Sequence, residues 1–152
     1  FIGSAGCWVG EAAAITRTRH RADLRTRSAT QAFYLSLTRF EELTTADPRA
    51  FRSFSELTIT HMDNAFMLAS ILAAPDTGSR VVATLYRLAG AFREIDDQFE
   101  LPCRQSEIAE MAGMSRNTAG PVLRDLASSG LIQIGRNLIR YNPVRLRGAL
   151  AL

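Results

Sequence analysis

The pattern of apolar and polar positions in the middle of the chain predicts one unusually long helix. Asp47 followed by Pro48 is a typical helix start, because an acidic side chain caps free amide groups and proline suits the first turn. No further proline occurs before Pro75, so we expect a helix within residues 47–75. At 1.5 Å per residue such a helix is about 40 Å long, far longer than the average in globular proteins.

The apolar residues of this helix form two adjacent stripes, so two of its sides should be buried. One side would pack on its own domain and the other on a second copy of the chain, along a seam like that of a coiled coil. The alternative is a central helix in a monomeric core. The residues expected between two copies are Phe51, Phe54, Met62, Ala65, Ala69 and Leu72.

The segment before the long helix has the pattern of a β-rich module. Residues 22–36 alternate loosely between polar and apolar side chains and end in an apolar cluster, which predicts a strand. A short helix is expected around residues 39–43. We therefore interpret residues 1–46 as the end of such a module.

The last third of the chain predicts a helix-turn-helix followed by a β-hairpin. Apolar residues at helical spacing precede Gly113, which suits a sharp turn, and Ser115 then caps a second helix over residues 115–128. After Gly130 the apolar positions alternate in two runs separated by a short glycine-containing turn, which is typical of a hairpin. Residues 76–152 are therefore expected to form a winged helix.

Composition narrows the class of protein. Of the 152 residues, 47% are hydrophobic and 22% are charged, as in ordinary globular proteins. No apolar run approaches the roughly 20 residues of a membrane-spanning helix, so we expect a cytoplasmic protein with no membrane partner. The chain begins with Phe1 rather than Met, so we expect that an N-terminal portion is missing. Cys7 and Cys103 are isolated, and no catalytic arrangement is recognisable, so neither a metal site nor an enzyme is expected.

Charge is distributed unevenly along the chain. Residues 103–152 carry seven arginines against three acids, whereas residues 41–100 carry five arginines against ten acids. A basic end of this kind is typical of a domain that binds nucleic acid.

The second helix of the predicted winged helix carries the chemistry for reading DNA. Arg116, Asn117 and Arg124 would project into the major groove, where arginine pairs with guanine and asparagine with adenine. Pro121 should kink this helix and offers an apolar contact to a thymine methyl group. Side chains at the helix starts and in the hairpin turn would hold phosphates. The residues expected at DNA are Gln105, Ser106, Ser115, Arg116, Asn117, Thr118, Pro121, Arg124 and Arg136.

Two alternatives of other classes stay open. Winged helices also serve as protein-interaction modules, with a polar face that contacts a partner protein instead of DNA. The chain could equally be a ligand-binding sensor whose winged helix does not read DNA, for which the expected kink in the recognition helix is the best argument.

The order of these elements resembles the Crp/Fnr family of transcription regulators. The resemblance covers essentially the whole chain and includes SEIA at residues 106–109 and GMSRNT at residues 113–118. Its most specific piece is the Ser-Arg-x-Thr start of the second helix, at residues 115–118. It implies an α+β protein made of the end of a β-roll sensor, a long dimerisation helix and a C-terminal winged helix-turn-helix. The corresponding ranges are 1–46, 47–75 and 76–152.

The same resemblance implies partners and a mode of action. It implies a bacterial homodimer that binds an inverted-repeat operator in double-stranded DNA and contacts RNA polymerase. A signal in the sensor would change the packing of the long helices and so the spacing of two recognition helices, matched to half-sites about 34 Å apart.

The effector is not fixed by the resemblance. In the family a Gly-Glu pair and a later Arg-Ser pair hold a cyclic nucleotide. The matching positions here are Gly3, Ser4, His20 and Arg21, or in another register Gly10 and Glu11 with Arg21. Both registers depart from the family pattern, so a cyclic nucleotide, another small ligand or no ligand all remain open.

Overall fold

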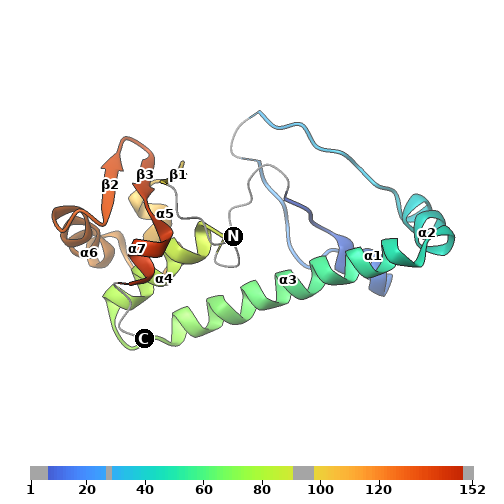
Figure 1. The fold of residues 1–152 in the computed structure, drawn as a ribbon, viewed down its shortest axis with the longest axis horizontal. Helices are drawn as coiled ribbons and strands as arrows, with labels where there is room; N and C mark the ends of the chain where they lie inside the picture. The colour runs from blue at the N-terminus through green and yellow to red at the C-terminus, as the bar shows by residue number, and fades with distance from the viewer. Residues whose placement is uncertain (1–6, 27–28, 91–97, 149–152) are drawn as a thin grey trace. The chain divides into compact units, whose positions relative to one another are not determined.

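The computed structural model describes residues 7–26, 29–90 and 98–148 (Figure 1). The chain divides into an N-terminal unit within residues 3–63 and a C-terminal unit from residue 64 onward. The long helix α3 contributes to both units. The elements, in chain order, are α1 (Glu11–Thr16), α2 (Leu37–Ala46), α3 (Pro48–Ala73), α4 (Thr77–Leu88), β1 (Phe99–Leu101), α5 (Gln105–Met111), α6 (Arg116–Ser128), β2 (Ile132–Gly135), β3 (Leu138–Tyr141) and α7 (Pro143–Arg147).

The long helix forms where the sequence predicts it. Helix α3 has 26 residues and starts at Pro48. The Asp47 carboxylate accepts the backbone N–H of Arg49 at 2.9 Å and also binds the Arg49 guanidinium. These hydrogen bonds lower the pKa of Asp47, because they stabilise its charged form. The expected cap and proline start are thus confirmed.

A small aromatic cluster organises the N-terminal unit. The ring of Phe54 on α3 lies 4.8 Å from Phe40 on α2 and 5.5 Å from Trp8, measured between centroids. Phe40 is buried, whereas Trp8 is more than one-third exposed. Helix α2 confirms the short helix expected around residues 39–43 and extends it in both directions.

The strand expected over residues 22–36 does not form. The described residues of this segment have no helix or strand, and Phe33 and Tyr34 are almost fully exposed. A strand requires hydrogen bonds to a neighbouring strand, and the described residues of the N-terminal unit supply none. An alternating pattern in one segment does not supply the partner strand that its backbone hydrogen bonds require.

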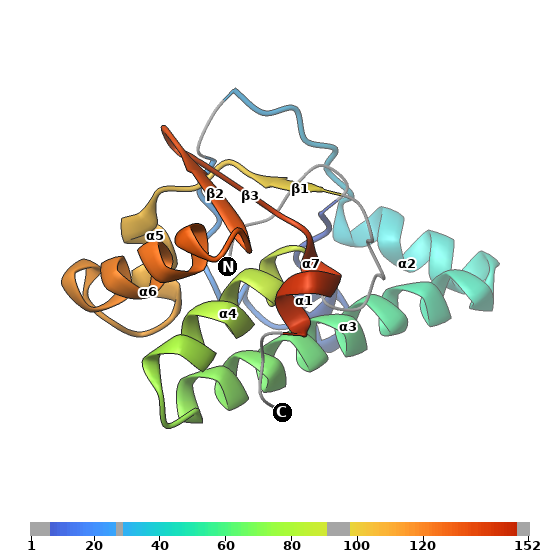
Figure 2. The ribbon, with the colours of Figure 1, turned by 60° about the vertical axis from the view of Figure 1, so that its left-hand side comes forward.

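The described residues of the C-terminal unit form a three-stranded antiparallel sheet, the end of α3 and the helices α4, α5, α6 and α7. The strand order is β1-β3-β2, with Phe99 and Ile132 both opposite Tyr141 (Figure 2). The expected hairpin is confirmed, and Asn137 in its turn has a positive φ of 59°. Together the helices and the sheet confirm an α+β fold.

One hydrophobic core joins the elements of the C-terminal unit. Leu85 on α4, Ile108 on α5 and Leu123 on α6 are all completely buried in it. The hydroxyl of the buried Tyr141 donates to the Leu85 carbonyl at 2.7 Å, and burial raises the pKa of Tyr141. This core fixes the helix pair α5–α6 against α4 and the sheet.

The described part of the chain has neither a helix suited to a membrane nor a cluster of metal-binding side chains. None of its helices combines the length and the apolar character needed to cross a membrane. Among the same residues, no group of three or more histidine, cysteine or acidic side chains is placed to hold a metal ion.

Candidate nucleic-acid interface

The turn between α5 and α6 depends on glycine and on close packing. Gly113 has a positive φ of 66°, a conformation that costs other residues about 1–2 kcal/mol. A Cβ atom at Gly113 would lie only 2.8 Å from Cδ2 of Leu72, at the end of α3. Glycine therefore serves both the backbone conformation and the contact, as a sharp helix-turn-helix requires.

The start of α6 is capped as the sequence predicts. The Ser115 hydroxyl oxygen accepts the N–H of Thr118 at 3.1 Å and lies 2.8 Å from the Thr118 hydroxyl. The first amides of any helix lack partners within the helix and carry a partial positive charge. Arg116 and Asn117 are exposed residues in this first turn, so their amides are candidates to bind a phosphate group.

The exposed side of α6 carries the side chains expected to read bases. Asn117, Pro121 and Arg124 are all exposed, and at 100° per residue they lie opposite the buried Ala119 and Leu123. Helix α6 continues unbroken through Pro121, although proline cannot donate to the Asn117 carbonyl. The kink expected there stays a prediction.

Glycine lies beneath one of these arginines. Gly120 is buried, and a Cβ atom placed on it would be 3.5 Å from the Arg124 guanidinium. The Arg124 side chain therefore lies along the helix surface toward the N-terminal end of α6. This orientation concentrates positive charge at the same end as Arg116.

The residues expected at phosphates lie on other elements of the same unit. Gln105 and Ser106 begin α5, and Arg136 lies in the hairpin turn. Ser106 and Arg136 are exposed, whereas Gln105 is partly buried. All three are on segments that pack directly against α6 or connect to strands that do.

The arginines of this candidate interface have no internal carboxylate partners. Arg116, Arg124 and Arg136 are all exposed, and none of the three forms an ion pair among the described residues. Arg140 on the same hairpin behaves differently, because its guanidinium is bound to Glu100 on β1 at 2.5 Å. The guanidinium groups that the sequence assigns to DNA on α6 and in the hairpin turn are thus among those without a carboxylate partner in the described part of the chain.

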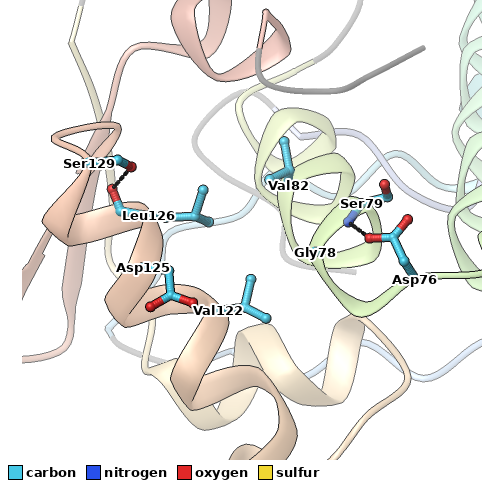
Figure 3. A pocket seen from close by; sticks show the side chains of 8 residues that line it. All are labelled: Asp76, Gly78, Ser79, Val82, Val122, Asp125, Leu126 and Ser129. Atoms are coloured by element: carbon cyan, nitrogen blue, oxygen red, sulfur yellow. Dashed lines mark hydrogen bonds between the residues drawn. The ribbon is translucent and has the colours of Figure 1, made fainter.

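A shallow groove beside α6 is acidic, in contrast to the basic surface formed by the exposed arginines. It measures about 540 Å³ and lies between the start of α4 and the C-terminal half of α6 (Figure 3). Asp76 and Asp125 flank its apolar side chains, which come from Val82, Val122 and Leu126. Two carboxylates repel phosphate, so this groove marks where the basic surface of α6 ends.

The residues expected between two copies of the chain fall into two groups. Phe51, Met62 and Leu72 are about half exposed, and Ala65 and Ala69 are exposed as well. Phe54 differs, since its ring packs against Trp8 and Phe40 of its own unit. The structure adds two exposed apolar side chains to the first group, Ile59 and Phe66.

The residues expected to bind an effector are only partly placed. Gly3 and Ser4 lie outside the described residues. Arg21 and His20 are exposed, and the His20 ring lies so close to Gly10 that a Cβ there would be 2.8 Å from His20 Cε1.

In the other alignment with the family pattern, Gly10 and Glu11 are the residues expected at the effector. Glu11 makes a contact that the sequence could not reveal. Glu11 is buried, and its Oε1 lies 2.8 Å from Nδ1 of His61 on α3. The two residues are fifty positions apart, and no local pattern links them. His61 thus engages one oxygen of the Glu11 carboxylate, whereas the other, Oε2, is buried and has no hydrogen-bond partner.

Comparisons with known proteins agree with this architecture. The Crp-like helix-turn-helix domain family matches residues 79–149. The chain is 24% identical over 141 residues to the cAMP-activated global transcriptional regulator CRP of Haemophilus influenzae, covering 90% of this chain and 63% of that protein. It is 27% identical over 142 residues to the protein of the same name from Pasteurella multocida, covering 91% and 68%.

The fold is also similar to that of solved structures. FixK2 from Bradyrhizobium japonicum superposes with a TM-score of 0.63 at 19% identity, over 78% of this chain and 60% of that one. The chain therefore spans somewhat less than two thirds of the Haemophilus and Bradyrhizobium relatives. These matches agree in both sequence and fold: residues 79–149 match the Crp-like helix-turn-helix domain family, and the chain is similar to regulators of the Crp/Fnr type over most of its length.

Proposed function

We propose that this chain acts as a sequence-specific DNA-binding transcription regulator. The observation that carries the proposal is the set of exposed arginines on α6 and in the hairpin turn, which have no carboxylate partner among the described residues. Arg116 and Asn117 stand at the capped start of α6, where side chains and amides can meet base edges and phosphates together. Such a function belongs in the bacterial cytoplasm.

The regulator works as a homodimer in this proposal. Exposed apolar side chains on α3 share one side of the helix, within an arc of about 140° at 100° per residue. These residues are Phe51, Ile59, Met62, Ala65, Phe66, Ala69 and Leu72. A two-fold dimer along this side would present two α6 helices to an inverted repeat.

Control by a signal and contact with RNA polymerase are carried over from the family as parts of this proposal. Two relatives are named as cAMP-activated. In this chain the residues depart from the family's pattern for that ligand, because no serine follows Arg21. The effector, if one acts here, therefore has another chemistry or another site.

The test is a selection of duplexes from a random DNA pool at a stated salt concentration. The wild-type protein should enrich an inverted repeat. Arg116→Ala should weaken binding by about 1–3 kcal/mol and relax the preference at one base pair of each half-site. Arg145→Ala, an exposed arginine on α7, is the matched control and should enrich the wild-type sequence.

Other outcomes separate the alternatives. If Arg116→Ala selects the same sequence with unchanged affinity, α6 does not read bases and the proposal is wrong. Binding to a partner protein that excess DNA does not compete would instead identify the winged helix as a protein-interaction module. Binding of a small molecule without any DNA preference would identify a sensor.

A further inference from the structure

Pro121 removes one hydrogen bond from α6 without ending the helix. Each N–H in the interior of an α-helix donates to the carbonyl four residues earlier, but proline has no N–H. Helix α6 runs from Arg116 to Ser128 with Pro121 inside it, so the Asn117 carbonyl loses its ordinary donor. Among the described residues, no backbone N–H from outside the helix takes the place of that donor.

This carbonyl lies on the side of α6 that is expected to face DNA. Carbonyl groups of an α-helix point along the axis toward its C-terminal end, so the Asn117 oxygen is directed at Pro121. Asn117, Pro121 and Arg124 are all exposed, and they lie within an arc of about 60° at 100° per residue. The unpaired acceptor therefore belongs to the same surface as the side chains expected to read bases.

Contact with DNA changes what this carbonyl needs. In the free protein, water can donate to an exposed carbonyl, but a helix that enters the major groove displaces water from its facing side. A polar group that loses water without gaining a new partner weakens binding. The proline ring is compact and is bonded to its own backbone nitrogen, so the helix backbone at Pro121 can come closer to a base than behind a long side chain.

The major groove offers donors from two bases only. Adenine and cytosine present an exocyclic amino group, whereas guanine and thymine present acceptors. An A·T pair adds the thymine methyl group to the adenine amino group, and the Pro121 ring beside the carbonyl is an apolar surface that suits a methyl group. We propose that the Asn117 carbonyl and the Pro121 ring together read one A·T base pair in each half-site. The carbonyl accepts the adenine amino group, directly or through one ordered water, and the ring contacts the thymine methyl group.

This inference rests on the proposed DNA-binding function, and base analogues in the operator selected by the wild type test it. Unsubstituted purine in place of adenine removes the amino group, and uracil in place of thymine removes the methyl group. Each change at the proposed pair should weaken binding of the wild type by about 2- to 10-fold per half-site. That range corresponds to one hydrogen bond or one buried methyl group.

The variant Pro121→Val separates the two contacts. Valine supplies the missing N–H to the Asn117 carbonyl and keeps an apolar side chain at the same position. This variant should no longer distinguish adenine from purine, yet it should still distinguish thymine from uracil. The Asn117 side chain is the same in both proteins, so its own contact with a base does not enter the comparison. Pro102→Ala removes an exposed proline outside α6 and should discriminate like the wild type.

The resonance of the Asn117 carbonyl carbon reports the contact directly. Asn117 and Thr118 form the only Asn-Thr pair in the sequence, so ¹³C-carbonyl asparagine combined with ¹⁵N-threonine isolates this one signal. In the wild type the resonance should shift more on binding the operator with adenine than on binding the operator with purine. In Pro121→Val the two operators should give the same shift.

Two results would overturn this inference and leave the proposed function intact. One is an equal loss of affinity for the purine operator in the wild type and in Pro121→Val. The other is a selected operator in which no A·T pair responds to Pro121→Val. In both cases Arg116→Ala would still alter the selected sequence. If the wild type selects no sequence at all, the proposed function itself is wrong, and this inference fails with it.

Discussion

The two units of this chain differ in how they dispose of their apolar side chains. In the C-terminal unit, fifteen buried residues form one core that reaches every helix and strand from α4 to α7. In the described part of the N-terminal unit, Phe40 is the one buried apolar side chain, while Leu24, Phe33 and Tyr34 are largely exposed. The C-terminal unit has the buried apolar core that an independent domain needs, and the described part of the N-terminal unit does not.

This difference separates the two tasks proposed for the protein. A closed core holds α6 and its exposed arginines in a fixed geometry, as base recognition requires. Exposed apolar surface in the N-terminal unit and along α3 has the opposite meaning, because large apolar patches on soluble proteins mark surfaces that meet other surfaces. Recognition therefore belongs to the closed core of the C-terminal unit, and association belongs to the open apolar surface of α3 and of the N-terminal unit.

The largest expected effect comes from a cavity in the closed core. Leu123→Ala should lower the free energy of unfolding of the C-terminal unit by about 2–5 kcal/mol, because Leu123 is completely buried. Phe40→Ala should cost less, since its partner Phe54 is only partly buried and Trp8 is exposed. Urea titrations followed by far-UV circular dichroism and by the fluorescence of the single tryptophan, Trp8, distinguish the units.

In that experiment Leu123→Ala should move the dichroism transition and leave the Trp8 transition in place. Phe40→Ala should do the reverse. Coincident shifts of both probes in both variants would show that the two units unfold as one, and the contrast drawn between them would be lost.

The next effect concerns the open surface of α3. Phe66 is 63% exposed on the apolar side of this helix. Phe66→Glu should weaken the proposed dimer at least about 100-fold, because two copies lose apolar burial and gain like charges across the two-fold axis. Ser53→Glu places the same charge on the opposite side of α3 and should leave association unchanged. Sedimentation equilibrium measures both, and equal dissociation constants would contradict the proposed seam.

A smaller effect is expected at the turn of the helix-turn-helix. Gly113→Ala and Gly130→Ala both place a Cβ at positive φ, which costs about 1–2 kcal/mol. Only the Cβ atom at Gly113 also meets Leu72, at 2.8 Å, whereas Gly130 has open space around it. Gly113→Ala should therefore lower Tm more than Gly130→Ala. When Leu72→Ala is added to Gly113→Ala, it should restore only the part of the Tm loss by which Gly113→Ala exceeds Gly130→Ala. Equal losses at the two glycines would show that the Leu72 contact relaxes freely.

The closed unit was also the more predictable from sequence. Ser115 as a cap, Gly113 as a turn and the change to alternating apolar positions after Gly130 are local signals, and each produces its element. Helix α7 was missed because five residues are too few for a period to show. Asn142 followed by Pro143 was the available signal, since the Asn142 side chain accepts the N–H of Arg145.

The open unit shows where sequence patterns fail. The strand expected over residues 22–36 needed a neighbouring strand to form hydrogen bonds with, which its alternating pattern does not encode, and the described residues of the N-terminal unit contain no strand. The contact between Glu11 and His61 joins residues fifty positions apart. The free state of Arg116 and Arg124, as opposed to the pairing of Arg140 with Glu100, likewise depends on which chain segments meet in space.

The smallest effect expected is a dependence of the helix caps on pH. The Asp76 carboxylate caps α4 by accepting the N–H of Ser79 at 2.7 Å, and hydrogen bonds from Ser79 lower the pKa of Asp76 below its usual value of 3.8. A depressed pKa in the folded state means that the charged cap stabilises the protein above about pH 4. That contribution is lost as pH falls through the folded-state pKa. Asp47, which caps α3, is lowered in the same way by Arg49.

Asparagine caps a helix without titrating, so Asp76→Asn and Asp47→Asn are matched probes of the two units. Relative to its asparagine variant, the wild type should lose stability between pH 5 and pH 2, because only the aspartate is protonated over about that range. For Asp76 the loss should show in circular dichroism, and for Asp47 in Trp8 fluorescence. If the Asp47 difference also appears in the C-terminal transition, the long helix transmits stability between the units, and the separation of closed and open units holds only for their cores.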